Sequence, residues 1–100
     1  MKTFSEEEIL EYRELHIKNW KFENNSLRRD FKFRSFVDAF SFMTAVALEA
    51  EKMNHHPDWS NGYNRVSVSI TNHSAGGITQ LDFDLAEKMD RIFNNFPQLA

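Results

Sequence analysis

A chain of 100 residues has the length of one compact domain, and ten phenylalanines with 41% hydrophobic residues are typical of a packed core. The net charge of −3 comes from interspersed acids and bases, so neither nucleic acid nor an anionic membrane is a predicted partner. The absence of cysteine excludes disulfides, a thiol nucleophile and a thiolate metal cluster. With no signal-peptide pattern and no apolar window long enough for a membrane span, we expect a single cytoplasmic domain over residues 1–100.

The first half of the chain begins with a helix pattern and continues with a strand pattern. Ser5 and Glu8 form a capping box, which predicts a helix from this point that ends before Trp20. Apolar and charged residues then alternate on both sides of the turn residues 24–26, which predicts a β-hairpin with one buried face. The densest group of basic side chains follows this turn and is interpreted as part of a solvated strand face: Arg28, Arg29, Lys32 and Arg34.

A long helix is predicted over residues 36–53, because a second cap pattern starts at Ser35 and the segment contains neither glycine nor proline. Its apolar residues occupy more than one side. Phe42 and Val46 lie well away from the stripe that contains Phe40. We therefore expect the helix to contact the domain's own sheet and also a second copy of the chain.

The second half repeats the hairpin and helix patterns. Residues 59–63 and 65–71 alternate as two strands, although Gly62 indicates that the first of them is bulged or loose. A loop over residues 73–77 and a cap over residues 79–82 precede the last helix. The predicted fold is a two-layer α+β sandwich, a four-stranded antiparallel sheet with three helices on one face, in the order α-β-β-α-β-β-α.

Three histidines and one acid are the candidates for chemistry. His55 and His56 precede Pro57 in the loop that enters the second hairpin, His73 lies in the loop that leaves it, and Asp82 opens the last helix. Antiparallel pairing can bring these places together. Imidazole gives and takes protons near neutral pH, and a neighbouring carboxylate fixes its tautomer and steadies its cation. These residue types therefore suit a proton-transfer site.

Other interpretations stay open on the pattern alone. Asp82 stands where a capping-box acid belongs, and a histidine pair before proline is also ordinary turn surface. Two histidines with a carboxylate are a possible metal-ligand set, although no spacing here matches a metal motif. An acid/base site, a metal site and a solvated loop are the three alternatives.

Two segments, "EKMNHHPDWSNGYN" and "TNHSAGGITQLD", hold several uncommon residues at fixed separations. They resemble the signature of the pterin-4a-carbinolamine dehydratases, in which an acid precedes His-His-Pro, followed by an aromatic, a later histidine and an aspartate. The resemblance implies the fold predicted above and removal of water from a 4a-hydroxytetrahydropterin, giving a quinonoid dihydropterin. It also implies that no metal or organic cofactor is required, and that the reaction recycles the pterin used by aromatic amino-acid hydroxylases.

The resemblance also implies roles for particular residues. The catalytic set carried over by position is His55, His56, His73 and Asp82. The implied substrate-binding set is Glu51, His55, His56, Pro57, Trp59, Asn72, His73, Ser74 and Ala75. Within these sets we expect His56 and His73 to be the principal acid/base groups, with His55 aiding departure of the hydroxyl or substrate binding.

The expected partners are a pterin substrate and further copies of the chain. We expect a homodimer or homotetramer formed through the helix 36–53 and a sheet edge, with a functional link to an aromatic amino-acid hydroxylase. The alternative is a binding module of the same fold that acts as a coactivator without catalysis and docks its partner through the helix near Phe42 and Val46.

Overall fold

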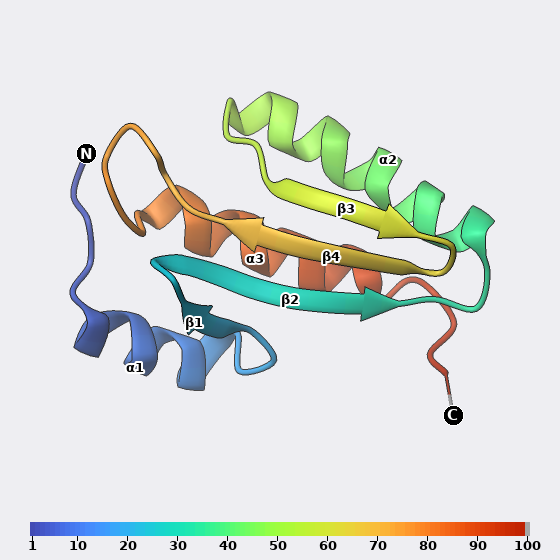
Figure 1. The fold of residues 1–100 in the computed structure, drawn as a ribbon, viewed down its shortest axis with the longest axis horizontal. Coiled ribbons are helices and arrows are strands. Elements are labelled where there is room, and N and C mark those ends of the chain that lie inside the picture. The colour runs from blue at the N-terminus through green and yellow to red at the C-terminus, as the bar shows by residue number, and fades with distance from the viewer. Residues whose placement is uncertain (100) are drawn as a thin grey trace.

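The chain folds in the predicted order of elements. The computed structural model describes residues 1–99. Its elements are α1 (Glu6–His16), β1 (Lys21–Glu23), β2 (Ser26–Lys32), α2 (Phe36–Met53), β3 (Asp58–Gly62), β4 (Arg65–Ile70) and α3 (Gln80–Phe93). This order and the single four-stranded antiparallel sheet confirm the predicted α+β fold (Figure 1). Among the described residues, no helix combines the length and apolarity that a membrane span requires.

The sheet has the strand order β1-β2-β4-β3, so β3 is an edge strand. Pairing between β3 and β4 is regular from Asp58, opposite Ser69, to Gly62, opposite Arg65. The expected bulge at Gly62 is therefore wrong: a glycine in an edge strand keeps the ladder without needing a side chain to pack. Because the pairing is antiparallel, β3 begins at the sheet end where β4 finishes.

Helices α2 and α3 cover one face of the sheet, and α1 lies beside β1 (Figure 1). The buried core between these layers contains Leu27, Phe31, Val66, Val68 and Ile70 from the strands and Phe42, Val46, Leu85 and Met89 from the helices. Each large side chain removed from water here contributes about 1.5–3 kcal/mol to folding. Packing against α2 and α3 therefore stabilises the sheet with these strand residues on its inner face.

Helix α2 has two apolar sides, and the side with Phe42 and Val46 packs against the sheet. Phe42 and Val46 are 0% exposed. They lie at helical spacing with the buried Ala39 and Ala50. The prediction that Phe42 and Val46 form a docking surface is therefore wrong. The solvent side, called here the exposed α2 face, carries another apolar set: Phe36, Val37, Phe40 and Leu48.

Arg29 also departs from the sequence interpretation, because it lies on the inner face of β2. Its Nη1 atom is 2.6 Å from Oδ1 of Asp90 on α3, and the indole N–H of Trp20 donates to the same oxygen at 2.8 Å. The guanidinium carbon lies 4.4 Å from the Phe31 ring centroid and 5.1 Å from that of Phe93. Arg29 is two residues from both Leu27 and Phe31, so strand alternation places it with them rather than with the solvated residues.

We expect Arg29→Met to lower the free energy of unfolding by about 2–3 kcal/mol at pH 7, because it leaves Asp90 partly buried with only the Trp20 donor. Burial raises the pKa of the Asp90 carboxyl above its ordinary value of 3.8, although Trp20 and Arg29 both oppose that rise. The folded state thus holds this proton more tightly than the unfolded chain, and stability falls as pH rises from about 4 through the folded pKa. Without Arg29 the stability should fall further as the pH rises. The loss of stability of Arg29→Met relative to wild type should therefore be smaller at pH 5 than at pH 7.

Urea unfolding at pH 7 and pH 5 measures this effect. The matched control is Arg28→Met, since Arg28 forms no ion pair within residues 1–99 and its change should cost less than about 0.5 kcal/mol. Equal losses for the two arginine variants would contradict the proposed weight of the Arg29 and Asp90 pair.

Candidate active site

The predicted site residues gather where α2 ends and β3 begins. Asn54 ends α2 in the left-handed conformation with a φ of 52°. The His55 amide then donates to the carbonyl of Ala50 at 3.1 Å, which ties the start of the loop to the helix end. This turn sets His55 and His56 at the sheet end where β3 starts.

His55 and Asp82 form a buried pair. Nε2 of His55 lies 2.6 Å from Oδ1 of Asp82, and the two residues are 8% and 0% exposed. An ionised Asp82 carboxylate can only accept, so in the neutral form of the His55 ring Nε2 carries the proton and Nδ1 has the free lone pair. Within residues 1–99 no protein group hydrogen-bonds to Nδ1, and this atom is not sealed in the core. The arrangement leaves His55 with a basic nitrogen of fixed direction.

His56 and His73 each have a carboxylate partner at the surface. Nε2 of His56 lies 2.9 Å from Oε1 of Glu51, which is five residues earlier and belongs to the last turn of α2. Nε2 of His73 lies 3.2 Å from Oδ2 of Asp58. These side chains are 58–80% exposed. Exposed pairs of this kind stabilise a fold by only about 0–1 kcal/mol, so folding alone gives little reason for them.

Asp58 is a site residue that the sequence analysis missed. It is the first residue of β3 and pairs with Ser69 near the end of β4, so the loop that carries His73 returns beside it. The signal was its place directly after Pro57 at a strand start. Only the register of the β3 and β4 pair shows that Asp58 faces the later loop.

The loop after β4 is a closed turn. An isolated bridge joins Asn72 to Gly77, and Oδ1 of Asn72 accepts from the amide of Ala75 at 3.0 Å. Gly76 adopts a φ of 81°, which favours glycine. The turn holds His73 and Ser74 outside the sheet, while the Ala75 amide is already engaged within the loop.

Three separate pairs therefore replace the expected arrangement of several histidines around one acid. Of the three histidines, Asp82 hydrogen-bonds to His55, while within residues 1–99 Glu51 is the partner of His56 and Asp58 the partner of His73. In the part of the chain that the structure describes, no three histidine and acidic side chains are placed to hold one metal ion.

Trp59 is half-buried and packs against the core.

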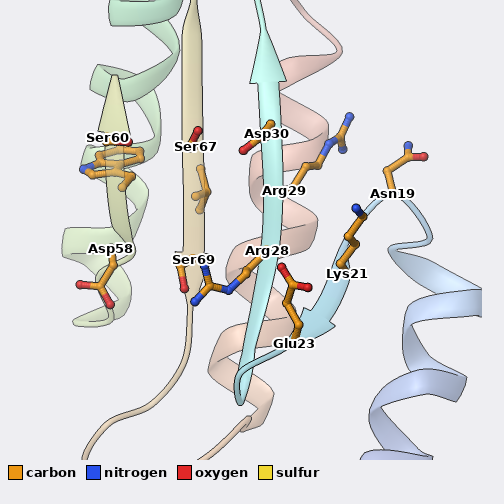
Figure 2. Close-up of a pocket in the computed structure, with 12 residues that line it drawn as sticks. Asn19, Lys21, Glu23, Arg28, Arg29, Asp30, Asp58, Ser60, Ser67 and Ser69 are labelled. Carbon is orange, nitrogen blue, oxygen red and sulfur yellow. The ribbon is translucent and has the colours of Figure 1, made fainter. Parts of the chain in front are cut away.

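A polar hollow of about 600 Å³ on the open face of the sheet adjoins this edge. Figure 2 shows side chains from three neighbouring strands in one row: Asp58 on β3, Ser69 on β4 and Arg28 on β2. The Arg28 guanidinium reaches toward Ser69 (Figure 2). Because Asp58 lines the hollow and also contacts His73, the hollow and the histidine loop meet at this residue.

The fold and the site define an α+β domain with histidine–carboxylate pairs at one sheet end. The chain belongs to the pterin 4 alpha carbinolamine dehydratase family, whose model matches residues 2–92.

Individual relatives agree with this assignment. A protein of Prochlorococcus marinus (strain NATL2A), provisionally named a pterin-4-alpha-carbinolamine dehydratase, is 47% identical over 77% of this chain and 81% of its own length. The crystal structure of a transcriptional coactivator/pterin dehydratase from Brucella melitensis superposes with a TM-score of 0.86 at 41% identity, covering 91% of this chain and 98% of that one. A pterin dehydratase-like RuBisCO assembly factor of the alpha-carboxysome shares the fold, with a TM-score of 0.66 at 21% identity over 78% of this chain and 93% of that one.

Proposed function

We propose that this chain is a dehydratase that converts a 4a-hydroxytetrahydropterin into a quinonoid dihydropterin and water. The observation that carries the proposal is the set of three histidine–carboxylate pairs at one sheet end, in a chain of this family. Such pairs supply both a base and a stabilised imidazolium, which are the two groups that a dehydration requires.

The proposed step breaks the bond between C4a and its hydroxyl oxygen and forms a C4a–N5 double bond. One proton joins the departing hydroxyl, which leaves as water, and the proton on N5 passes to a base. The step exchanges no electrons with another molecule, so in this proposal neither a metal nor an organic cofactor takes part. Histidine acid/base chemistry completes it.

The two exposed histidines are the proposed principal acid and base. The rings of His56 and His73 are open to water, and each is oriented by a carboxylate partner. His55 has the supporting role, because its ring is held by Asp82 and directs Nδ1 away from that carboxylate. That nitrogen would position the substrate by accepting a hydrogen bond or, once it has taken up a proton, would donate that proton to the departing hydroxyl.

The proposed reaction links the chain to enzymes that use a pterin cofactor. The 4a-hydroxytetrahydropterin is the form in which an aromatic amino-acid hydroxylase releases its pterin, so we propose a cytoplasmic chain that acts after such an enzyme. The assay is ultraviolet detection of quinonoid dihydropterin formed from freshly made 4a-hydroxytetrahydropterin. Acceleration over spontaneous dehydration supports the proposal.

Self-association is part of the proposal. The exposed α2 face carries an aromatic pair, Phe36 and Phe40, whose ring centroids are 5.8 Å apart, and both side chains are about half exposed. Within residues 1–99 the β3 strand has a strand partner, β4, on one side only. Apolar helix faces and open strand edges are the surfaces through which copies of a chain associate. We therefore propose a homodimer or homotetramer formed through α2 and the sheet edge.

Phe40→Glu is expected to shift the protein to a smaller assembly, because it places a charge in the middle of the exposed α2 face. Light scattering at micromolar concentration measures the change. Glu14→Gln on α1, at an exposed position away from this face, is the control and should leave the mass unchanged. A wild-type protein that is strictly monomeric would refute the proposed association.

The second candidate is a non-catalytic binding module, favoured by the same exposed α2 face. It predicts a partner complex whose strength survives replacement of the three histidines but not Phe40→Glu. The dehydratase proposal predicts instead that activity is lost when the three histidines are replaced and survives Phe40→Glu.

A further inference from the structure

Thr79 is fully buried and directs both of its hydrogen-bond donors to one carboxylate. It is 0% exposed and immediately precedes α3 in an extended conformation. Its amide donates to Oδ2 of Asp82 at 2.7 Å, and its hydroxyl donates to the same oxygen at 3.0 Å. The other oxygen of Asp82 faces His55 at 2.6 Å. Three residues thus form one buried chain of contacts.

This use of the hydroxyl goes beyond helix capping. A threonine at a helix start stabilises the helix by accepting from a backbone amide, a role that leaves its proton uncommitted. Here the single hydroxyl proton goes to Asp82, and hydrogen bonds to a charged acceptor are about twice as strong as neutral ones. Two donors on Oδ2 resist rotation of the carboxylate, so Oδ1 stays aimed at Nε2 of His55.

We propose that Thr79 is a positioning residue for the dehydration, acting through Asp82 on the ring of His55. This inference rests on the proposed function for its kinetic part. Without the hydroxyl, the carboxylate can turn, the His55 ring loses its fixed direction, and Nδ1 no longer meets the substrate at the required angle. Catalytic groups lose efficiency when their supporting contacts loosen, because productive geometry tolerates only small displacements.

The test compares Thr79→Val, which keeps the amide and similar bulk but removes the hydroxyl, with Thr79→Ser, which keeps the hydroxyl. We expect Thr79→Val to lower kcat about tenfold with KM little changed, and Thr79→Ser to stay within about twofold of wild type. Ser35→Ala is the matched control, because its hydroxyl caps α2 by accepting from the Asp38 amide at 3.1 Å and, among the described residues, does not hydrogen-bond to a histidine or its carboxylate partner. It should lower stability and leave kcat unchanged.

A second readout does not depend on activity. The proton on Nε2 of His55, held in a 2.6 Å contact with Asp82, should give a downfield NMR resonance. That resonance should move in Thr79→Val and keep its position in Thr79→Ser and Ser35→Ala. If the wild type lacks dehydratase activity, the proposed function fails while the NMR comparison still decides whether Thr79 positions His55.

The proposal is overturned if Thr79→Val loses stability alone, with kcat and the His55 resonance unchanged. Should Thr79→Val fail to fold, the wild-type protein decides: a Thr79 hydroxyl proton in slow exchange with solvent supports the contact to Asp82. A freely exchanging hydroxyl proton contradicts it.

Discussion

Asp82→Asn is expected to lower kcat for the pterin dehydration by about a hundredfold or more, with KM changed only a few-fold. The reason is a reversal of hydrogen-bond roles. Thr79 supplies two donors, so the amide oxygen of the new asparagine will face Thr79 and its NH₂ group will face His55. Nε2 of His55 must then accept, which moves the ring proton to Nδ1 and removes the basic nitrogen from the open side.

The control for this variant lies on the same helix. Asp84→Asn changes a carboxylate two residues away that accepts from Gln80 and, within residues 1–99, forms no hydrogen bond with a histidine. It should leave kcat within about twofold of wild type. Circular dichroism and urea unfolding will show whether Asp82→Asn keeps the fold. Wild-type kcat in folded Asp82→Asn would mean that the buried pair serves only the α3 cap.

His56→Ala is expected to lower kcat about a thousandfold, more than Asp82→Asn because His56 is a principal acid/base group, while changing the free energy of unfolding by less than about 0.5 kcal/mol. The side chain is 58% exposed and within residues 1–99 its hydrogen-bond partner is Glu51, so its loss leaves no cavity in the core. The open position also allows chemical rescue. Free imidazole in the buffer should restore part of the activity.

His16→Ala is the matched histidine control for this prediction. His16 is the last residue of α1, exposed, and its ring packs beside Tyr12 rather than against a carboxylate. Kinetics of both variants, measured with and without imidazole, separate a general loss of surface histidine from loss of the acid/base group. Equal activity of His56→Ala and His16→Ala would contradict the role given to His56.

Local patterns were enough to predict the elements and much of the site. The caps at Ser5 and Ser35 begin helices as expected, and alternation locates all four strands. His55 and Asp82 were expected near each other and form a pair. These features depend on residues that are close in sequence or on the pairing of adjacent antiparallel strands, so they can be predicted from the sequence.

The remaining features depend on packing and register. Helix α2 is apolar on two sides, and only the shape of the sheet decides that Phe42 is buried and Phe40 exposed. The partners of His56 and His73 depend on one helical turn and on one strand register, which composition does not encode. The predicted cap over residues 79–82 is present, but the hydrogen bond from the Thr79 hydroxyl to Asp82 could not be predicted, because residue spacing does not give the direction of a donor.

If these histidine–carboxylate pairs dehydrate a pterin carbinolamine, the wild-type protein must accelerate that reaction. Folded protein in excess is mixed with freshly generated 4a-hydroxytetrahydropterin, and quinonoid dihydropterin is followed by its ultraviolet absorbance. The account predicts a rate that rises above the spontaneous rate with added protein and returns close to it for the double variant with Asp82→Asn and His56→Ala. A rate equal to spontaneous dehydration at every concentration of folded wild-type protein would contradict the account.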